Sequence, residues 1–137
     1  MSIDYGDRRI GVALSDPMHK ISYPLCVIDQ NRDGNSINRI LEIAYEKEVE
    51  KIIIGLPLSM SGHHSNQTKK VISFKDLLIE ELLLKNIKIV IDTIDERLSS
   101  KSAKDEMIKQ GIKTGYNKGK IDTIAAAIIL QEYLDSK

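Results

Sequence analysis

The run Lys51 to Leu56 (KIIIGL) is the feature that most restricts how this chain can fold. Its β-branched residues favour a short strand, which Gly55 and Pro57 bring to an end. A strand that is apolar on both faces must be covered on both faces, as in parallel sheets with helices above and below. The segments 36–48 and 66–85, on either side of it, carry apolar residues at helical spacing. The pattern therefore predicts a helix, a buried strand and a second helix in succession.

The N-terminal part of the chain predicts three strands. Met1 to Tyr5 is an extended segment, Gly6 to Arg8 is a turn, and Ile10 to Leu14 alternates with Gly and Ala as a half-buried strand does. A third strand is expected from about 21 to 29, where Pro24 favours an edge or bulged position. Because the connections are short, these three strands are expected to be antiparallel.

The remaining elements complete an α/β pattern. Ser36 is expected to cap the helix 36–48. A strand is expected over 87–91, followed by helices over 99–110 and 121–134, and the last of these is apolar almost all round. This order implies a mixed sheet with helices on both faces, in which ligands bind beyond the carboxyl ends of the strands.

Size and charge limit the kind of partner. A chain of 137 residues fits one domain of common size, so a single domain over 1–137 is expected. Its 20 basic and 20 acidic residues balance, which removes any attraction of the whole molecule to a polyanion. A nucleic-acid surface would therefore be local. The best candidate is 109–120, with four lysines and no acid, although a solvated loop can have the same composition.

Composition also bears on compartment and on metal chemistry. Cys26 is the only cysteine, so no disulfide framework is possible. No segment approaches the ~20 apolar residues of a membrane span, and the N-terminus does not resemble a signal peptide. A cytoplasmic protein without a membrane partner is expected. The three histidines, at 19, 63 and 64, lack the spacing of a zinc site.

Three acidic residues are candidates for chemistry. Asp4 lies within the first strand, where a core-facing charge needs a partner, but a hairpin residue is the alternative. Glu96 follows the strand 87–91, and its alternative is a solvated charged loop. Asp122 lies in the first turn of the last helix, where an acid can simply complement the helix dipole.

These three acids have a shared chemical use if they converge. Carboxylate oxygens are the preferred ligands of hard divalent ions such as Mg²⁺ or Mn²⁺. Two such ions about 4 Å apart can generate a hydroxide and stabilise the attacking and leaving oxygens in phosphodiester hydrolysis. Asp4, Glu96 and Asp122 would suffice to hold them.

The motifs of the chain resemble a known family. In order they are 4–13 (DYGDRRIGVA), 15–17 (SDP), 55–57 (GLP), 95–98 (DERL) and 122–126 (DTIAA). Together they resemble the YqgF/RuvX family over almost the whole chain. The resemblance implies a ribonuclease H-like α/β fold, with a five-stranded mixed sheet in the order 3-2-1-4-5 and helices on both faces.

The resemblance also implies an activity. The family is similar to Holliday-junction resolvases, and its bacterial members are associated with processing the 5′ end of precursor 16S ribosomal RNA. A Mg²⁺- or Mn²⁺-dependent nuclease is implied, with precursor rRNA or branched DNA as substrate and ribosomal particles as further partners. Carried over by position, the acidic site is Asp4, Glu96 and Asp122, and the substrate-side cations are Arg9, Arg97, Lys118 and Lys120.

Two features depart from the family pattern. The loop after 55–57 often has Asn and Asp where this chain has Ser59 and Ser61. Only three residues precede Asp4, so the first strand is short.

Two other functions stay open on the sequence. A non-catalytic RNA-binding or ribosome-assembly factor could keep the acids for structural metal binding, and its low aromatic content of 4% would favour recognition of backbone and shape over base stacking. Asp4-Tyr5-Gly6 also suits the phosphate loop of sugar-kinase and actin-like ATPases. Those proteins need two such domains, and 137 residues supply one.

Overall fold

A computed structural model of the chain describes residues 1–58, 65–95 and 118–137, with the backbone alone for 118–121. The strands are β1 (Ser2–Tyr5), β2 (Arg9–Ser15), β3 (Ser22–Asp29), β4 (Lys51–Leu56) and β5 (Val90–Asp95), and the helices are α1 (Ser36–Glu46), α2 (Asn66–Leu84) and α4 (Lys118–Asp135). The strands form a five-stranded sheet in the order β3-β2-β1-β4-β5, as expected. The helix predicted over 99–110 lies outside the described residues.

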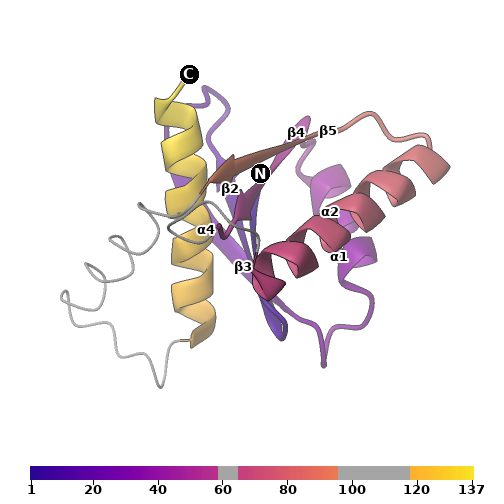
Figure 1. Cartoon of the computed structure of the whole chain (residues 1–137). Coiled ribbons are helices and arrows are strands. Elements are labelled where there is room, and N and C mark those ends of the chain that lie inside the picture. The colour runs from indigo at the N-terminus through magenta and orange to yellow at the C-terminus, as the bar shows by residue number, and fades with distance from the viewer. Residues whose placement is uncertain (59–64, 96–117) are drawn as a thin grey trace.

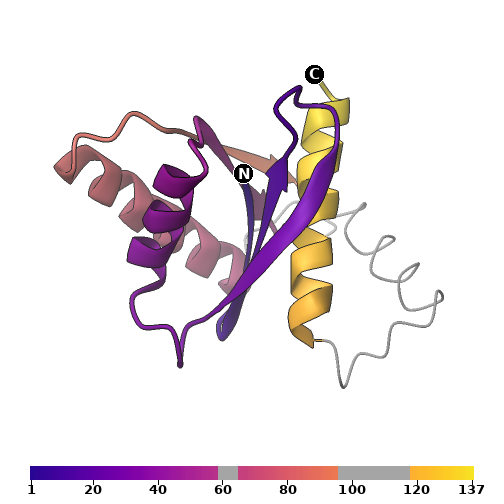
Figure 2. The same cartoon turned by 180° about the vertical axis from the view of Figure 1, so that it is seen from behind.

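The sheet separates two layers of helices. In Figures 1 and 2, α1 and α2 cover one face of the sheet and α4 covers the other. Ile52 and Ile54 of β4 belong to the core under α1 and α2, whereas Ile53 belongs to the core under α4. The run 51–56 is therefore buried on both faces, as its composition predicts. Within the described ranges, no helix combines the length and apolar character that crossing a bilayer requires.

Pro24 lies in an edge strand and beside a bulge, as predicted. β3 is at one edge of the sheet, and its pairing with β2 slips between Val12, which faces Cys26, and Ala13, which faces Pro24. The slip leaves one extra residue on β3 and forms a bulge. Proline is tolerated there because its missing N–H is not needed in the ladder.

The strand predicted over 87–91 was misplaced, because β5 begins only at Val90 and continues through Asp95. The chain uses 85–89 to leave α2, and Asn86 adopts a left-handed backbone with φ of 55°. The segment 92–95, in which only Ile94 is apolar, can extend the strand because β5 is at the sheet edge. Asp92, for example, accepts a hydrogen bond from Tyr133 of α4 at 3.1 Å.

The cap of α1 was misplaced by one residue. The N-cap is Asn35, whose side chain accepts a hydrogen bond from the backbone N–H of Asn38 at 3.1 Å. Ser36 is the first helical residue, and its hydroxyl lies 3.4 Å from the side-chain oxygen of Gln30.

α4 approaches the sheet unusually closely. The Ser2 hydroxyl donates to the carbonyl of Ala126 at 2.7 Å, and the Ser22 hydroxyl donates to the carbonyl of Ala127 at 2.5 Å. At Gly11 of β2, an added Cβ would lie 2.0 Å from the carbonyl oxygen of Asp122. Only glycine permits this approach, so the start of α4 is held against the middle of the sheet.

Tyr133 ties the other end of α4 to β4 and β5. Its hydroxyl donates to Asp92, and the ammonium of Lys51 donates to the same hydroxyl at 3.0 Å. The backbone N–H of Thr93 and, to a smaller extent, the Tyr133 hydroxyl hold the pKa of Asp92 below its ordinary value. Contacts at both ends therefore fix the axis of α4.

Gly11→Ala should destabilise the protein by about 3 kcal/mol, because the new methyl group meets helix backbone that cannot rotate away. Gly34→Ala is the matched control: its Cβ meets no atom within 4 Å, and its positive φ should cost only about 1 kcal/mol. Urea unfolding measures both. Equal losses would show that α4 can move off Gly11 freely.

Asp92→Asn should lower the unfolding free energy near neutral pH by at most about 1 kcal/mol, since the site is partly open to solvent. Because folding lowers the pKa of Asp92, the contribution of its charge is present above the ordinary value of 3.8 and is lost as pH falls through the folded-state value. The gap between wild type and variant should therefore close in acid, whereas the exposed Asp76→Asn variant controls for net charge. A gap that stays constant with pH would contradict this account.

Candidate functional site

Asp4 lies at the centre of the sheet near the carboxyl end of β1. β1 pairs antiparallel with β2 and parallel with β4, so β1 and β4 end at the same edge. Ser2 and Asp4 are two residues apart on one strand and therefore face the same side. Since Ser2 bonds to α4, the half-buried Asp4 side chain projects toward α4 as well.

Asp122 lies opposite Asp4 on that side. β1 and α4 run antiparallel, because Ser2 meets Ala126 while the backbone of Asp122 lies over Gly11, the direct partner of Asp4. Two strand residues advance about 6.6 Å and four helical residues about 6 Å. The distance along β1 from Ser2 to Asp4 therefore matches the distance along α4 from Ala126 back to Asp122.

Arg9 is the third predicted residue that the fold brings to this place. It is the first residue of β2, two positions before Gly11, and so shares its face. Its Nε donates to the Oδ2 atom of Asp122 at 2.9 Å. Both side chains are mostly covered, with 29% and 25% of their areas exposed, so this ion pair is shielded more than a surface pair.

The structure does not describe the side chains of the other predicted site residues. Glu96 and Arg97 lie outside the described residues, as do 109–117, Ser59 and Ser61. Lys118 and Lys120 fall in the first turn of α4, where only the backbone is described. In the described ranges no three His, Cys, Asp or Glu side chains cluster as a metal site would require, and the predicted triad includes Glu96 from outside them.

The described part of the site has the donor chemistry of a hard divalent cation. Asp4 and Asp122 offer carboxylate oxygens, which Mg²⁺ and Mn²⁺ prefer. The packing of α4 over Gly11 sets the distance between the two backbones that carry them. Arg9 offsets the negative charge at Asp122. The residues therefore fit such an ion.

Two residues that build the site were not singled out as site residues from the sequence. Gly11 sets the approach of α4, and Ser2 fixes its register. A signal for Gly11 existed: β2 contains Gly11 and Ala13, small residues that match the alanines at 125–127 of the last helix. Small residues on facing elements indicate close packing, but they do not say which residue meets which.

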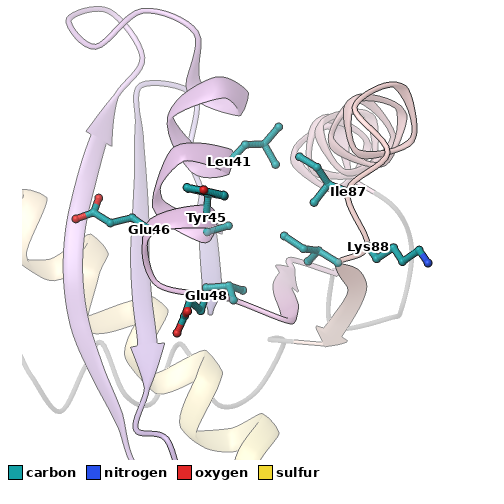
Figure 3. Close-up of a pocket in the computed structure, with 9 residues that line it drawn as sticks. Leu41, Tyr45, Glu46, Glu48, Ile87 and Lys88 are labelled. Atoms are coloured by element: carbon teal, nitrogen blue, oxygen red, sulfur yellow. The ribbon is translucent and has the colours of Figure 1, made fainter.

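A hollow of about 560 Å³ lies elsewhere, between the end of α1 and the segment before β5. Leu41 and Ile87 point toward each other across it, whereas Glu46 and Lys88 point away (Figure 3). Neither Asp4 nor Asp122 lines this hollow. The carboxylate site is therefore separate from this hollow.

Comparison with solved structures identifies a known fold. The structure of T. thermophilus RuvC in complex with a Holliday junction substrate is similar to this chain, with a TM-score of 0.59 and 15% sequence identity. The similarity covers 98% of this chain and 91% of that one. At this identity it shows the fold, which is ribonuclease H-like.

Sequence comparisons give the family. A family model described as "RuvX: Holliday junction resolvase" matches residues 1–136. A protein of Desulforamulus reducens named "Putative pre-16S rRNA nuclease" is 40% identical over 99% of this chain and 96% of its own length. A protein of Malacoplasma penetrans with the same name is 38% identical over 100% of this chain and 94% of its own. The chain therefore belongs to the RuvX family, also called YqgF.

Proposed function

We propose that this protein is a metal-dependent nuclease that hydrolyses phosphodiester bonds, and that its substrate is the 5′ end of precursor 16S ribosomal RNA. The observation that carries the proposal is the approach of Asp4 and Asp122 at one edge of the sheet, beside Arg9. The choice of RNA is supported by the names of relatives that are about as long as this chain. A cytoplasmic enzyme that meets its substrate on ribosomal particles follows from this choice.

The acids have distinct tasks in this proposal. Asp4 and Asp122 would hold one or two Mg²⁺ or Mn²⁺ ions, and Glu96 would complete the ligand set or orient water. When bound, such an ion supplies Lewis-acid neutralisation of phosphate charge and makes water more acidic. The strand that carries Asp4 and the helix that carries Asp122 are held rigidly by packing at Gly11, so little reorganisation is needed when substrate binds.

The cations act on the substrate and on the acids. Arg9 holds the Asp122 carboxylate in one orientation through its 2.9 Å hydrogen bond. Arg97, Lys118 and Lys120 would contact phosphates, which gives affinity that falls steeply with salt and discriminates little between bases. Substrate choice would then depend on shape more than on sequence.

A four-way DNA junction is the second candidate substrate. It is favoured by the description of the matching family and by the junction-bound structure of RuvC, which shares the fold. Both substrates present phosphates to the same edge of the sheet, so one acidic site would serve either. A non-catalytic RNA-binding factor is the third possibility, and the following experiment separates the three.

Asp4→Asn and Asp122→Asn should each reduce cleavage about 100-fold or more, because each removes a charge that holds the cation. Purified protein is incubated with precursor 16S rRNA and with a four-way junction, with and without Mg²⁺. Asp76→Asn, an exposed acid on α2, is the matched control and should cleave as wild type does. Cleavage that persists without metal or in both site variants would refute the mechanism, and cleavage of neither substrate by wild type would favour a binding factor.

Arg9→Gln should bind Mg²⁺ severalfold more tightly in the absence of substrate, since a positive charge next to Asp122 no longer opposes the ion. The same variant should cleave more slowly, because Asp122 loses the group that orients it. Calorimetric titration with Mg²⁺ gives the first quantity, and a cleavage assay gives the second.

Arg8→Gln is the control for this experiment, because Arg8 is the neighbouring residue, is 66% exposed and lies 3.9 Å from Asp29 instead. It should change neither quantity. Weaker Mg²⁺ binding by Arg9→Gln would mean that orientation of the carboxylate outweighs charge repulsion.

A further inference from the structure

α2 carries its charges in an unusual order. Its first ten residues, 66–75, include three lysines and no acid, whereas 76–84 includes three acids and no base. The positive end of the helix dipole is at the N-terminus, so lysines there and acids at the other end both oppose the dipole. The helix dipole therefore does not account for the lysines at the start of α2.

These lysines lie at the same edge of the sheet as Asp4. The hydroxyl of Thr68 in the first turn of α2 donates to the carbonyl of Pro57, just past the end of β4. The ammonium of Lys70 lies 3.2 Å from Asp7 in the turn after β1. Because β1 and β4 are parallel neighbours, both contacts place the start of α2 at the edge where β1 ends. In Figures 1 and 2 the first turns of α2 lie near the indigo turn that follows β1.

A hollow of about 310 Å³ opens beside these lysines. It is lined by Tyr5, Lys69, Lys70, Ser73, Phe74 and Leu77. The rings of Tyr5 and Phe74 lie 4.6 Å apart and form part of an apolar floor, which Leu77 extends with 53% of its area exposed. The two lysines make a cationic rim above it. A nucleotide has the matching chemistry, since its base has an apolar face and its phosphate is an anion.

The hollow and the proposed site lie on opposite faces of the sheet, but they involve consecutive residues of β1. Tyr5 directly follows Asp4, and consecutive strand residues face opposite sides. Asp4 therefore faces α4, while Tyr5 faces α2, where its ring meets Phe74. A single-stranded nucleic acid that passes over the end of β1 would therefore meet first one of these side chains and then the other.

We propose that the hollow between Tyr5 and the start of α2 binds one nucleotide of the substrate strand next to the cleaved bond, with its phosphate on Lys69 and Lys70. The inference rests on the proposed nuclease function and adds a second contact surface on the face of the sheet opposite α4. Within the described ranges, Lys69 has no carboxylate partner. Lys70 has an exposed partner in Asp7, and such pairs contribute little and are readily exchanged for a phosphate.

The double variant Lys69→Gln/Lys70→Gln tests the cationic rim. The probes are fluorescein-labelled single-stranded RNA and DNA 12-mers of one sequence, and anisotropy is measured in EDTA so that no cleavage occurs. We expect about tenfold weaker binding and a salt dependence whose log–log slope is smaller by about 0.7, because the contact with one phosphate is lost. Loss with both probes assigns the contact to shared backbone chemistry, and loss with RNA alone assigns it to RNA-specific geometry.

The matched control is Lys85→Gln/Lys88→Gln, which removes the same charge beyond the far end of α2. It should leave affinity and slope unchanged. Thermal unfolding guards against misfolding. Removal of Lys69 and Lys70 should change the unfolding midpoint little, because the lost Lys70–Asp7 ion pair is exposed and lysines near the start of a helix oppose its dipole. Equal effects of the two double variants on binding would overturn the proposal.

Ser73→Phe tests the hollow itself. Ser73 is exposed at its rim, so a phenyl group can fill the space without a change of charge. We expect severalfold weaker binding with an unchanged salt slope, and unchanged affinity would show that no nucleotide occupies the hollow.

Together, the binding and cleavage assays distinguish failure of this binding surface from failure of the proposed nuclease function. Normal binding by the lysine double variant, together with cleavage that requires Asp4, would remove this surface and leave the nuclease intact. Weakened binding by that variant, together with no cleavage by wild type, would keep the surface and remove the nuclease.

Discussion

The arrangement of the molecule depends on how closely α4 can approach the sheet. That distance is set at Gly11, where the absence of a side chain lets the backbone of Asp122 rest on β2. Ser2 then fixes the register by bonding to Ala126, and the hydroxyl of Tyr133 holds the far end. A larger residue at position 11 would separate two carboxylates that are 118 positions apart along the chain.

A mixed sheet with helices on both faces could be predicted from periodicity and turn residues, whereas the strand order was implied only by the family resemblance. The doubly buried run 51–56, the helical spacing in 66–85 and the edge position of Pro24 all have their expected places. The predicted strand was misplaced because the segment 87–91 has four apolar residues, whereas 92–95 contains two aspartates and one threonine. Periodicity cannot show that Asn86 and its neighbours are needed to leave α2, or that Tyr133 satisfies Asp92.

The residues of the candidate site could be named from the sequence, but the contacts between them could not. Asp4 and Asp122 were candidates from their places in predicted elements and from the family resemblance, and Arg9 from the resemblance alone. The structure brings the three together on one side of the sheet. The direct bond from Arg9 to Asp122 could not be foreseen, because spacing does not reveal which side chains meet across elements. The lysines of α2 did not predict a binding surface in the sequence, because only the structure shows that the start of that helix lies beside β1.

The antiparallel match of β1 with α4 also has a consequence for synthesis. β1 can pair with β2 as soon as both have left the ribosome, because the hairpin is local. Asp122 emerges much later, and until α4 docks, a nascent chain contains Asp4 but lacks its partner. The two carboxylates therefore come together only once translation has passed residue 122 and α4 has docked on the sheet.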